Sequence, residues 1–186
     1  MLGQVLQGSG LTIDAIEPNT EWADIARPFY RQVFATTVEG AQLPAGRYEA
    51  IVCADVLEHL ADPLAVLKQL RDAATPDALF LVSLPNIAHV SVRMMLLAGR
   101  FPKMERGILD RTHLQFFTRD TAADLLKSAG LQIEKITPTG LPIEHFWTGA
   151  ENKPFFRLLR GGQNVMLDLV PRLAAYQWVF QARRRN

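Results

Sequence analysis

A short apolar run from Ala50 to Ala54 ends abruptly in a cluster of groups that can do chemistry. An unbroken apolar run of this length is typical of a parallel strand that is covered on both faces. Asp55, Glu58 and His59 follow it, and ligands of open α/β sheets bind at the carboxyl ends of such strands. The stretch therefore predicts a buried strand with a functional site at its end. The alternative is that Asp55 caps a turn and the other two side chains face solvent.

Strands and helices alternate along the rest of the chain. Thr20, Asp62 and Thr118 are the expected N-caps of three helices, Pro63 suits a first helical position, and Gly130 marks a helix stop. The expected strands are 11–16, 31–36, 48–54, 78–84, 131–136 and 174–182, and the expected helices are 1–7, 20–28, 62–74, 94–97, 118–129 and 165–170. This order predicts an α/β fold with a doubly wound, mostly parallel sheet.

The composition is that of a folded domain without an obvious polyanionic partner. The chain has 186 residues, 48% hydrophobic and 21% charged, which is enough apolar material for a core. The net charge of +1 gives no electrostatic case for nucleic acid, and Arg183, Arg184 and Arg185 are expected to form a solvated tail. The single Cys53 lies in an apolar strand, where packing is its expected role. No apolar run approaches the roughly 18 residues of a membrane span and no signal peptide is evident, so we expect a cytoplasmic protein.

Two segments interrupt the alternation of strands and helices. Residues 85–117 combine a helical piece with Gly99, Pro102 and Gly107, and long irregular segments over a sheet edge often cover a site. Residues 138–173 mix glycine, proline and aromatic residues before the last strand. We therefore expect residues 1–186 to form a single domain, with a substrate-covering segment at 85–117 and an irregular insertion at 138–173.

Several phrases together carry a family resemblance. They are IEPN at 16–19, YEAIVCADVLEHLADPLAVLKQL at 48–70, LVSLPN at 81–86, GILDRTHLQFFT at 107–118 and AYQWVF at 175–180. In combination they resemble a bacterial branch of the class I S-adenosylmethionine-dependent methyltransferases, from about Met1 to Arg184. The resemblance implies a Rossmann-like methyltransferase fold in a single domain.

The resemblance also implies where the cofactor S-adenosylmethionine binds. In the family an acidic residue at the end of a strand accepts hydrogen bonds from the ribose, and a carboxylate suits a vicinal diol. That position corresponds to Glu17, with Pro18 and Asn19 beside the adenine. Thr37 stands where many relatives have an acidic residue near the adenine, so the adenine contact is expected from the backbone around Val38. The remaining cofactor residues implied are at the end of the central strand: Ala54, Asp55 and Val56.

The chain departs from the family pattern at its start. Relatives have a strand and a glycine-rich loop directly before the residues that match MLGQVL, and this chain begins after them. We therefore expect an N-terminally truncated fold: a fragment, a protein whose true start lies upstream, or a fold that has compensated. One alternative to an enzyme is a non-catalytic methyltransferase-fold remnant or partner subunit that cannot bind the cofactor. A dinucleotide-dependent oxidoreductase is another alternative, because Glu17 suits NAD equally well. It is weaker because the sequences DVLEHL and LPN do not belong to that class.

The expected reaction is transfer of a methyl group to a hydroxyl. The resemblance implies a small hydroxylated, sugar or lipid-linked acceptor. An aliphatic hydroxyl must lose its proton, and a neutral imidazole is the usual base near pH 7. His59 and His113 are therefore the candidate catalytic residues. The alternative for His113 is a structural hydrogen bond within its own segment.

A divalent metal is a further expectation from the resemblance. Asp55, Glu58 and His59 match the acid-x-x-Glu-His motif of the quinone-pathway O-methyltransferases and the small-RNA 3′-terminal 2′-O-methyltransferases, and the latter have a further histidine that corresponds to His113. Two carboxylates and two imidazoles suit Mg²⁺ or Mn²⁺. Such an ion lowers the pKa of a bound hydroxyl. Many relatives have a similar sequence motif without a known metal. In that case His113 is a simple base or a structural residue.

Overall fold

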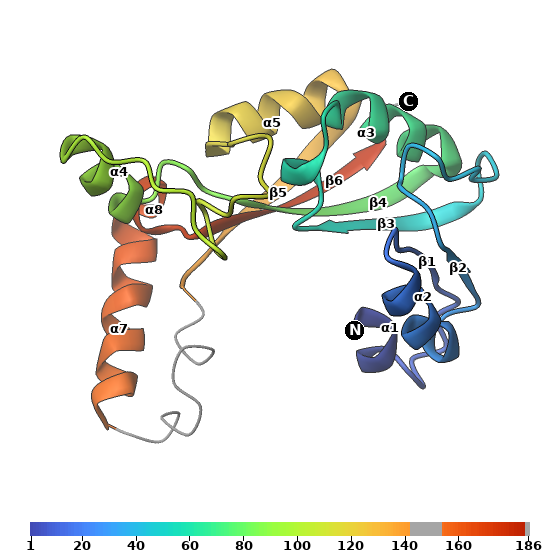
Figure 1. Ribbon diagram of the computed structural model, residues 1–186, viewed down its shortest axis with the longest axis horizontal. Helices are drawn as coiled ribbons and strands as arrows, with labels where there is room; N and C mark the ends of the chain where they lie inside the picture. Colours follow the sequence, from blue (N-terminus) through green and yellow to red (C-terminus); the bar gives the residue numbers. More distant parts are fainter. Residues whose placement is uncertain (142–153, 185–186) are drawn as a thin grey trace. The chain divides into compact units, whose positions relative to one another are not determined.

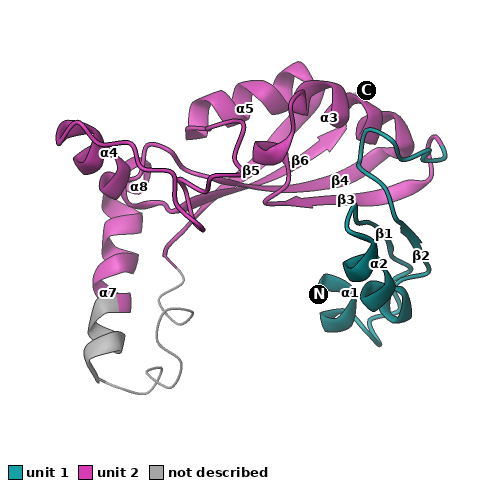
Figure 2. Cartoon of the chain, viewed as in Figure 1, with its two compact units in different colours: residues 1–44 teal, residues 45–186 magenta. Residues whose placement is uncertain are grey.

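The computed structural model describes residues 1–141 and 154–184. The chain divides into two compact units, Met1–Pro44 and Ala45–Asn186 (Figure 2). Each unit contains helices and a sheet, which confirms the α/β class expected from the sequence. None of the described helices has the length and apolarity needed to cross a membrane.

The first unit is a small βαβ arrangement. Its elements are α1 (Leu2–Val5), β1 (Asp14–Ile16), α2 (Thr20–Ala26), the short 3₁₀ helix η1 (Arg27–Phe29) and β2 (Gln32–Phe34). The two strands pair in parallel over their whole length. Buried Ala23, Ala26 and Val33 form its core, against which Ala15 and Tyr30 pack. The small side chains of α2 let the helix approach the strands closely.

One of the expected caps in this unit is wrong. Asn19, and not Thr20, caps α2, because the Asn19 Oδ1 atom accepts a hydrogen bond of 3.0 Å from the Trp22 N–H. Asparagine and threonine are both common at the N-cap position. Here Asn19 is the N-cap because its backbone is extended, whereas Thr20 is already helical. The helix expected over 20–28 is present from Thr20 to Ala26, and Pro28 lies in the 3₁₀ turn η1 that follows it.

The second unit is built around a four-stranded sheet. Its elements are β3 (Tyr48–Ala54), η2 (Leu57–His59), α3 (Pro63–Ala73), β4 (Ala74–Pro85), α4 (Val90–Leu97), α5 (Arg119–Ser128), β5 (Leu131–Thr139), α7 (Pro154–Leu169), α8 (Pro171–Ala174) and β6 (Gln177–Arg184). The strand order is β3-β4-β6-β5. β3 and β4 are parallel, and β6 runs antiparallel to both β4 and β5. Three of the four strands therefore point the same way, as expected for a mostly parallel sheet.

Helices α3 and α5 cover the same face of this sheet (Figure 1). The largest buried side chains beneath them include Phe80 and Phe180 from the strands and Leu67 and Leu126 from the helices. Burial of each phenylalanine contributes roughly 1.5–3 kcal/mol relative to exposure. This layer is the core of the unit. It also contains Cys53, whose thiol is buried as expected and whose pKa is raised by that burial to about 12.

The expectation that β3 is covered on both faces is wrong for the described residues. Ile51 and Cys53 are buried, but Val52 between them is 47% exposed. Within the four-stranded sheet β3 is an edge strand, and the two helices cover only one of its faces. An unbroken apolar run therefore alternates between buried and exposed positions here.

The local start and stop signals of the second unit are largely confirmed. Asp62 caps α3 by accepting from the Ala65 N–H at 2.9 Å, and Pro63 is the first helical residue. Thr118 forms a capping box with Thr121 at the start of α5. Gly130 follows that helix with φ of 80°, a conformation that favours glycine.

The expected bounds of the last strand are wrong at both ends. Residues 171–174 form the short helix α8, so β6 begins at Gln177. Arg183 and Arg184 belong to β6 and are not a solvated tail: Arg183 pairs with Glu134 at 2.9 Å, and Arg184 donates to the Ala74 carbonyl at 2.9 Å. Arg185 and residues 142–153 of the expected insertion lie outside the described residues.

The segment between β4 and α5 forms a second, smaller core. Val92 on α4 is buried with Ile108 and Leu109, and Met95 and Phe116 pack against them. Asn86 and Phe117, at the two ends of the segment, meet in an isolated parallel bridge. The segment that the sequence marks as irregular therefore has a defined packing of its own.

Candidate active site

Three polar side chains of the second unit lie together where β3 and β4 end and β6 begins. Asp55 follows β3 directly, Ser83 lies near the end of β4, and Gln177 starts β6. Gln177 donates from Nε2 to Asp55 Oδ1 at 2.6 Å, and the Ser83 hydroxyl donates to the same oxygen at 3.4 Å. Asp55 has φ of 53° and is the non-glycine residue with positive φ among the described residues. The three side chains therefore come from three strands and meet at one edge of the sheet.

Glu58 lies on η2, immediately beyond this edge, and its carboxylate is buried without a partner. The residue is 1% exposed, and neither Oε1 nor Oε2 has a hydrogen-bond partner among the described residues. Burial is the main cause that raises the pKa of this carboxyl to about 7; the residue's own backbone amide favours the ionised form and opposes the shift, and the negative charge of Asp55 adds to it. An ionised carboxylate in such a place is costly unless something positive lies beside it.

The backbone of Glu58 brings a distant segment to the same place. Its carbonyl accepts hydrogen bonds from the N–H groups of Leu114 at 2.8 Å and Gln115 at 3.0 Å. His113 stands immediately before these two residues and is buried. The loop that precedes α5 is therefore held against η2 by the main chain, independently of any side-chain contact.

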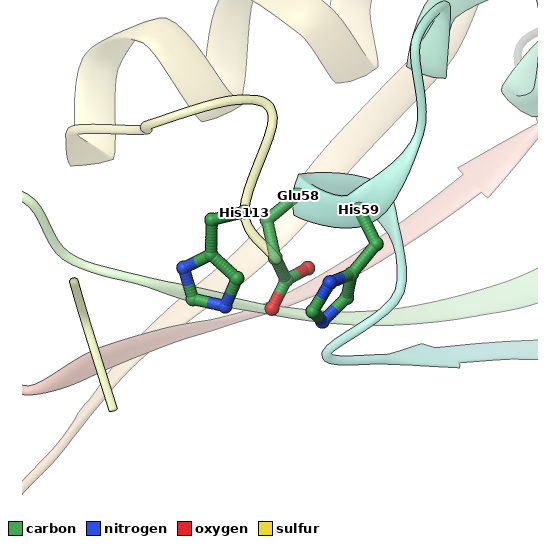
Figure 3. Close-up of side chains that lie close together, drawn as sticks. All are labelled: Glu58, His59 and His113. Atoms are coloured by element: carbon green, nitrogen blue, oxygen red, sulfur yellow. The ribbon is translucent and has the colours of Figure 1, made fainter. Parts of the chain in front are cut away.

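The two imidazoles flank the Glu58 carboxylate (Figure 3). The rings of His59 and His113 have centroids 4.8 Å apart and are inclined by 72°. One ligand atom from each of Glu58, His59 and His113 lies within 4.8 Å of the others. Burial lowers the pKa of His113, a hydrogen bond to the Ile108 backbone opposes this, and His59 lowers it further. A buried carboxylate thus faces two imidazoles from segments 54 residues apart in sequence (His59 and His113).

Backbone carbonyls define the tautomer of both rings. His113 Nδ1 lies 3.1 Å from the Ile108 carbonyl, and His59 Nδ1 lies 3.3 Å from the Thr112 carbonyl. Because a carbonyl oxygen only accepts, each Nδ1 carries a proton, so in the neutral form of either ring the lone pair is on Nε2. Asp110 holds Thr112 in place, accepting from its N–H at 2.8 Å and its hydroxyl at 2.7 Å. These hydrogen bonds lower the pKa of Asp110.

The residues present fit a divalent cation. Metal-bound histidines usually donate their other ring N–H to a carbonyl or carboxylate, as both imidazoles do here. The two unpartnered oxygens of Glu58 supply the negative charge that such a site needs. Three of the four expected ligands converge: Glu58, His59 and His113. Asp55 is not part of this group, and its Oδ1 atom accepts hydrogen bonds from Gln177 and Ser83 instead.

The expected cofactor residues of the first unit lie at the end of β1 and in a later turn. Glu17 follows β1, and its Oε1 atom accepts from the Asn19 N–H at 3.0 Å. The second oxygen, Oε2, accepts no hydrogen bond from the described residues. Pro18 is exposed between them. The Val38 carbonyl accepts from the Ala41 N–H at 3.2 Å, which closes a turn after β2.

The other expected cofactor residues belong to the second unit. Ala54 and Asp55 are exposed at the end of β3. Val56 follows, half-buried, and its carbonyl accepts from the His59 N–H at 3.1 Å to form η2. The turn that links β3 to the Glu58 cluster is therefore short and closed by a main-chain hydrogen bond.

Two residues of this region were missed by the sequence reasoning, Gln177 and Asn86. Asn86 is 1% exposed, and its Nδ2 donates to the Ala175 carbonyl at 2.8 Å. Its N–H donates to the Tyr176 carbonyl at 2.9 Å, so one residue anchors the start of β6 beside the end of β4. Asn86 ends the sequence LVSLPN and Gln177 lies in AYQWVF, and both residues are at strand ends. A polar residue at a strand end is the signal that could have identified them.

Comparison with known proteins finds similar sequences along most of the chain. A family model described as a methyltransferase domain matches residues 2–136. The chain is also 31% identical over 125 residues to the ubiquinone biosynthesis O-methyltransferase of Cereibacter sphaeroides. That match covers 66% of this chain and 42% of the relative, so the chain spans less than half of the length of this curated protein.

Solved structures share the fold. A SAM-dependent methyltransferase from Archaeoglobus fulgidus superposes with a TM-score of 0.65 at 12% identity, over 97% of this chain and 80% of that one. The 1,6-didemethyltoxoflavin-N1-methyltransferase of Burkholderia thailandensis, solved with bound 1,6-didemethyltoxoflavin and S-adenosylhomocysteine, has a TM-score of 0.60 at 14% identity. The second match covers 98% of this chain and 65% of that one. These likenesses confirm the Rossmann-like architecture expected from the sequence.

Proposed function

Since the chain belongs to the class I S-adenosylmethionine-dependent methyltransferases, we propose that it transfers a methyl group from S-adenosylmethionine to a hydroxyl oxygen. The acceptor is a small hydroxylated, sugar or lipid-linked molecule. The relative from Cereibacter sphaeroides, whose name specifies an O-methyltransferase, supports oxygen as the acceptor atom. The observation that carries the proposal is the buried, unpartnered Glu58 carboxylate between two imidazoles at the end of β3.

The end of β1 suits the cofactor. Glu17 Oε1 is already held by the Asn19 N–H, which orients the carboxylate. The other oxygen is available to a ribose hydroxyl, and a vicinal diol needs such an acceptor. Asn19 also caps α2, so the residues beside the nucleoside are fixed by the helix start. This arrangement supports the role proposed for Glu17.

Glu58, His59 and His113 are the residues that would hold a Mg²⁺ or Mn²⁺ ion. When bound, such an ion lowers the pKa of a coordinated hydroxyl, which prepares an oxygen nucleophile near neutral pH. The chain supplies the rest. The carbonyls of Ile108 and Thr112 hold both Nε2 atoms toward the cluster, and the buried carboxylate is oriented before any substrate arrives. Preorganisation of this kind contributes to rate because nothing has to reorient in the transition state.

Methyl transfer itself requires position more than reactive groups. The acceptor oxygen must lie in line behind the methyl carbon, at near-contact distance, with water excluded. The packed segment around Val92, Ile108 and Leu109 lies in the chain between β4 and His113. This supports a role for residues 85–117 in covering the acceptor.

A radiochemical assay tests the proposal. The full-length protein is incubated with tritiated-methyl S-adenosylmethionine and a catechol, a sugar with vicinal hydroxyls, or a monophenol. We expect transfer to at least one diol, loss of transfer in EDTA, and restoration by Mn²⁺. Glu58→Ala and His113→Ala should lower the rate at least about 100-fold, whereas the control Asp124→Ala, at an exposed position of α5, should retain activity.

Three outcomes separate the parts of the proposal. No transfer to any hydroxylated acceptor, in a protein that binds S-adenosylhomocysteine, overturns O-methylation. Transfer that ignores EDTA but needs His113 removes the metal and makes His113 the base. Full activity in Glu58→Ala removes the cluster from the reaction.

A further inference from the structure

Helix α4 is apolar on two opposite sides, and the structure accounts for only one of them. Its inner side packs into the small core through Val92 and Met95. Its outer side exposes Val90 by 43%, Met94 by 60% and Leu97 by 82%. A helix that is apolar all round is normally buried. Here α4 lies beyond the carboxyl ends of β3 and β4, at the edge of the second unit (Figure 1).

The exposed side chains of α4 form one stripe. Residues in an α-helix are separated by about 100° of rotation, so positions 90, 93, 94 and 97 fall within an arc of about 100°. Three of these positions are apolar, and the fourth is Arg93. The stripe thus combines large apolar side chains with a cation that projects from the same side.

The chain after α4 continues the same composition. Phe101 is 45% exposed and Met104 is 44% exposed, and the intervening residues are exposed as well. Arg100, Lys103 and Arg106 add three cations to that of Arg93. Residues 90–106 therefore place six large exposed apolar side chains and four cations on a single stretch: Val90, Met94, Leu96, Leu97, Phe101, Met104, Arg93, Arg100, Lys103 and Arg106.

The cations of this stretch are not neutralised within the described part of the chain. Arg93 donates to the Ala88 carbonyl at 2.7 Å, which leaves its charge in place. None of the four cations forms an ion pair with a described acidic residue. The one acid of the stretch, Glu105, is paired with Arg111. Among the residues that the structure describes, the positive charge of these four cations therefore has no acidic partner.

We propose that residues 90–106 bind the surface of a membrane that contains anionic phospholipids. The apolar side chains enter the boundary between headgroups and acyl chains, and the four cations contact lipid phosphates. The helix lies in the plane of the surface, since no described helix is long and apolar enough to cross a bilayer. A membrane surface uses both kinds of side chain. Binding to nucleic acid would leave the apolar side chains without a role, and binding in an apolar groove of another protein would leave the cations without one.

This placement has a consequence for the substrate. The segment that contacts the membrane is continuous, through the small core of Ile108 and Leu109, with the loop that carries His113. An acceptor anchored in the same bilayer is delivered to the site without leaving the surface. This delivery of the acceptor rests on the proposed methyl transfer, whereas the membrane contact itself does not.

Vesicle sedimentation tests the membrane contact without any enzymatic readout. The full-length protein is spun with vesicles of phosphatidylcholine alone and with vesicles that also contain phosphatidylglycerol. We expect binding to the second kind only, and its loss as salt is raised. Arg100→Glu with Lys103→Glu should weaken partition at least about tenfold, since each cation near an anionic surface is worth about fivefold.

A second pair of variants tests the apolar part. Met94→Glu with Leu97→Glu should also weaken partition at least about tenfold. Leu11→Glu is the matched control, because Leu11 is 65% exposed but lies in the first unit, and it should bind as the wild type does. All substituted side chains are exposed, and thermal unfolding checks that each variant is folded.

Several results overturn the proposal. They are no binding to either vesicle, equal binding to both, binding that is indifferent to salt, or a loss in Leu11→Glu as large as in the α4 variants. The comparison of vesicles and the salt series use only the wild type, so the outcome does not depend on the folding of any variant. Retained binding in both double variants also removes residues 90–106 as the contact surface.

Discussion

Gln177 donates a hydrogen bond of 2.6 Å from Nε2 to Oδ1 of Asp55, a residue 122 positions earlier in the chain. Asp55 needs this support, because its φ of 53° is a conformation that a non-glycine residue adopts at a cost of roughly 1–2 kcal/mol. The Ser83 hydroxyl adds a longer bond of 3.4 Å to the same oxygen. A residue of β6 thereby holds the residue that directly follows β3.

We predict that Gln177→Leu weakens the binding of S-adenosylhomocysteine, since Asp55 is one of the proposed cofactor residues. The variant should also lose about 1 kcal/mol of unfolding free energy, as an exposed amide–carboxylate bond contributes at the low end of its range. Gln181→Leu is the control, because Gln181 also lies on β6 and the variant removes its amide–carboxylate bond of 3.2 Å to Glu134 on β5. Urea unfolding and isothermal titration measure the two effects. Equal losses of affinity in both variants contradict the role given to Gln177.

A second prediction concerns the stability of the metal-free protein. Glu58 is 1% exposed with no partner, and burial first, then Asp55, raises its pKa from 4.5 to about 7. Because the folded pKa lies above the unfolded value, the contribution of Glu58 to stability is fully present below pH 4.5 and is lost as the pH rises through about 7. Glu58→Gln removes this loss, so above that window it should be more stable than the wild type in EDTA, by at most about 3 kcal/mol.

The same variant separates a metal ligand from a merely buried acid. Mn²⁺ should raise the unfolding midpoint of the wild type and leave that of Glu58→Gln unchanged, because binding to the native state alone stabilises it. Urea midpoints from about pH 4.5 to pH 8 in EDTA, and with Mn²⁺, provide the data. A variant that is less stable than the wild type in EDTA at pH 8 disproves the account of Glu58.

A third prediction concerns the start of α4. His89 Nδ1 caps this helix by accepting from the Ser91 N–H at 3.3 Å, and burial lowers the pKa of the imidazole. Protonation therefore occurs more readily in the unfolded chain than in the folded one. The contribution of neutral His89 is present above the unfolded pKa of about 6.5 and is lost as the pH falls below it.

His89→Asn keeps a good cap without a titrating group. The stability of the wild type relative to this variant should decline as the pH falls from about 7.5 to 5. Thermal unfolding at matched pH values measures the difference. Parallel pH profiles for the two proteins refute the prediction.

A fourth prediction concerns the contact between Gly107 and Tyr176. Gly107 has φ of 94°, and a Cβ atom there would lie 2.6 Å from the Tyr176 hydroxyl oxygen. Gly107→Ala should therefore destabilise the protein by more than the roughly 1–2 kcal/mol of positive φ alone. Gly99→Ala is the control, since its φ of 69° is similarly strained but nothing lies within 4 Å of its Cβ position.

Tyr176→Phe tests the origin of the additional cost. In the double variant with Gly107→Ala the clashing oxygen is gone, so part of the loss should be recovered. A double-mutant cycle by urea unfolding measures the coupling. If Gly107→Ala and Gly99→Ala cost the same, the close approach of Tyr176 plays no part.

Local signals in the sequence predicted the local structure well. Proline after Asp62, a cap at Thr118 and glycine at position 130 each act within one helical turn, and all three appear as expected. The choice between Asn19 and Thr20 failed because adjacent residues with equal preference are distinguished only by backbone conformation. Burial of β3 failed for a different reason. Whether an apolar strand is covered on one face or two depends on its neighbours, which a run of residues does not encode.

In the candidate site, too, local features could be predicted from the sequence and long-range contacts could not. Glu58 and His59 are adjacent, so their proximity follows from sequence, while His113 was placed with them by the family resemblance. The main-chain bonds from Leu114 and Gln115 that hold His113 there have no sequence signature. Gln177 was invisible for the same reason, because its partner is set by the position of β6 in the sheet. Long-range pairing, rather than residue type, is what the sequence leaves open.

The strand order also governs how the protein is made. β6 lies between β4 and β5, so those two strands bond to it and never to each other. Until the ribosome has released Gln177–Arg184, both inner edges carry unpaired N–H and C=O groups that can capture another chain. Closure of the sheet is thus a late, non-local step of synthesis, and the half-made protein is the form most in need of a chaperone.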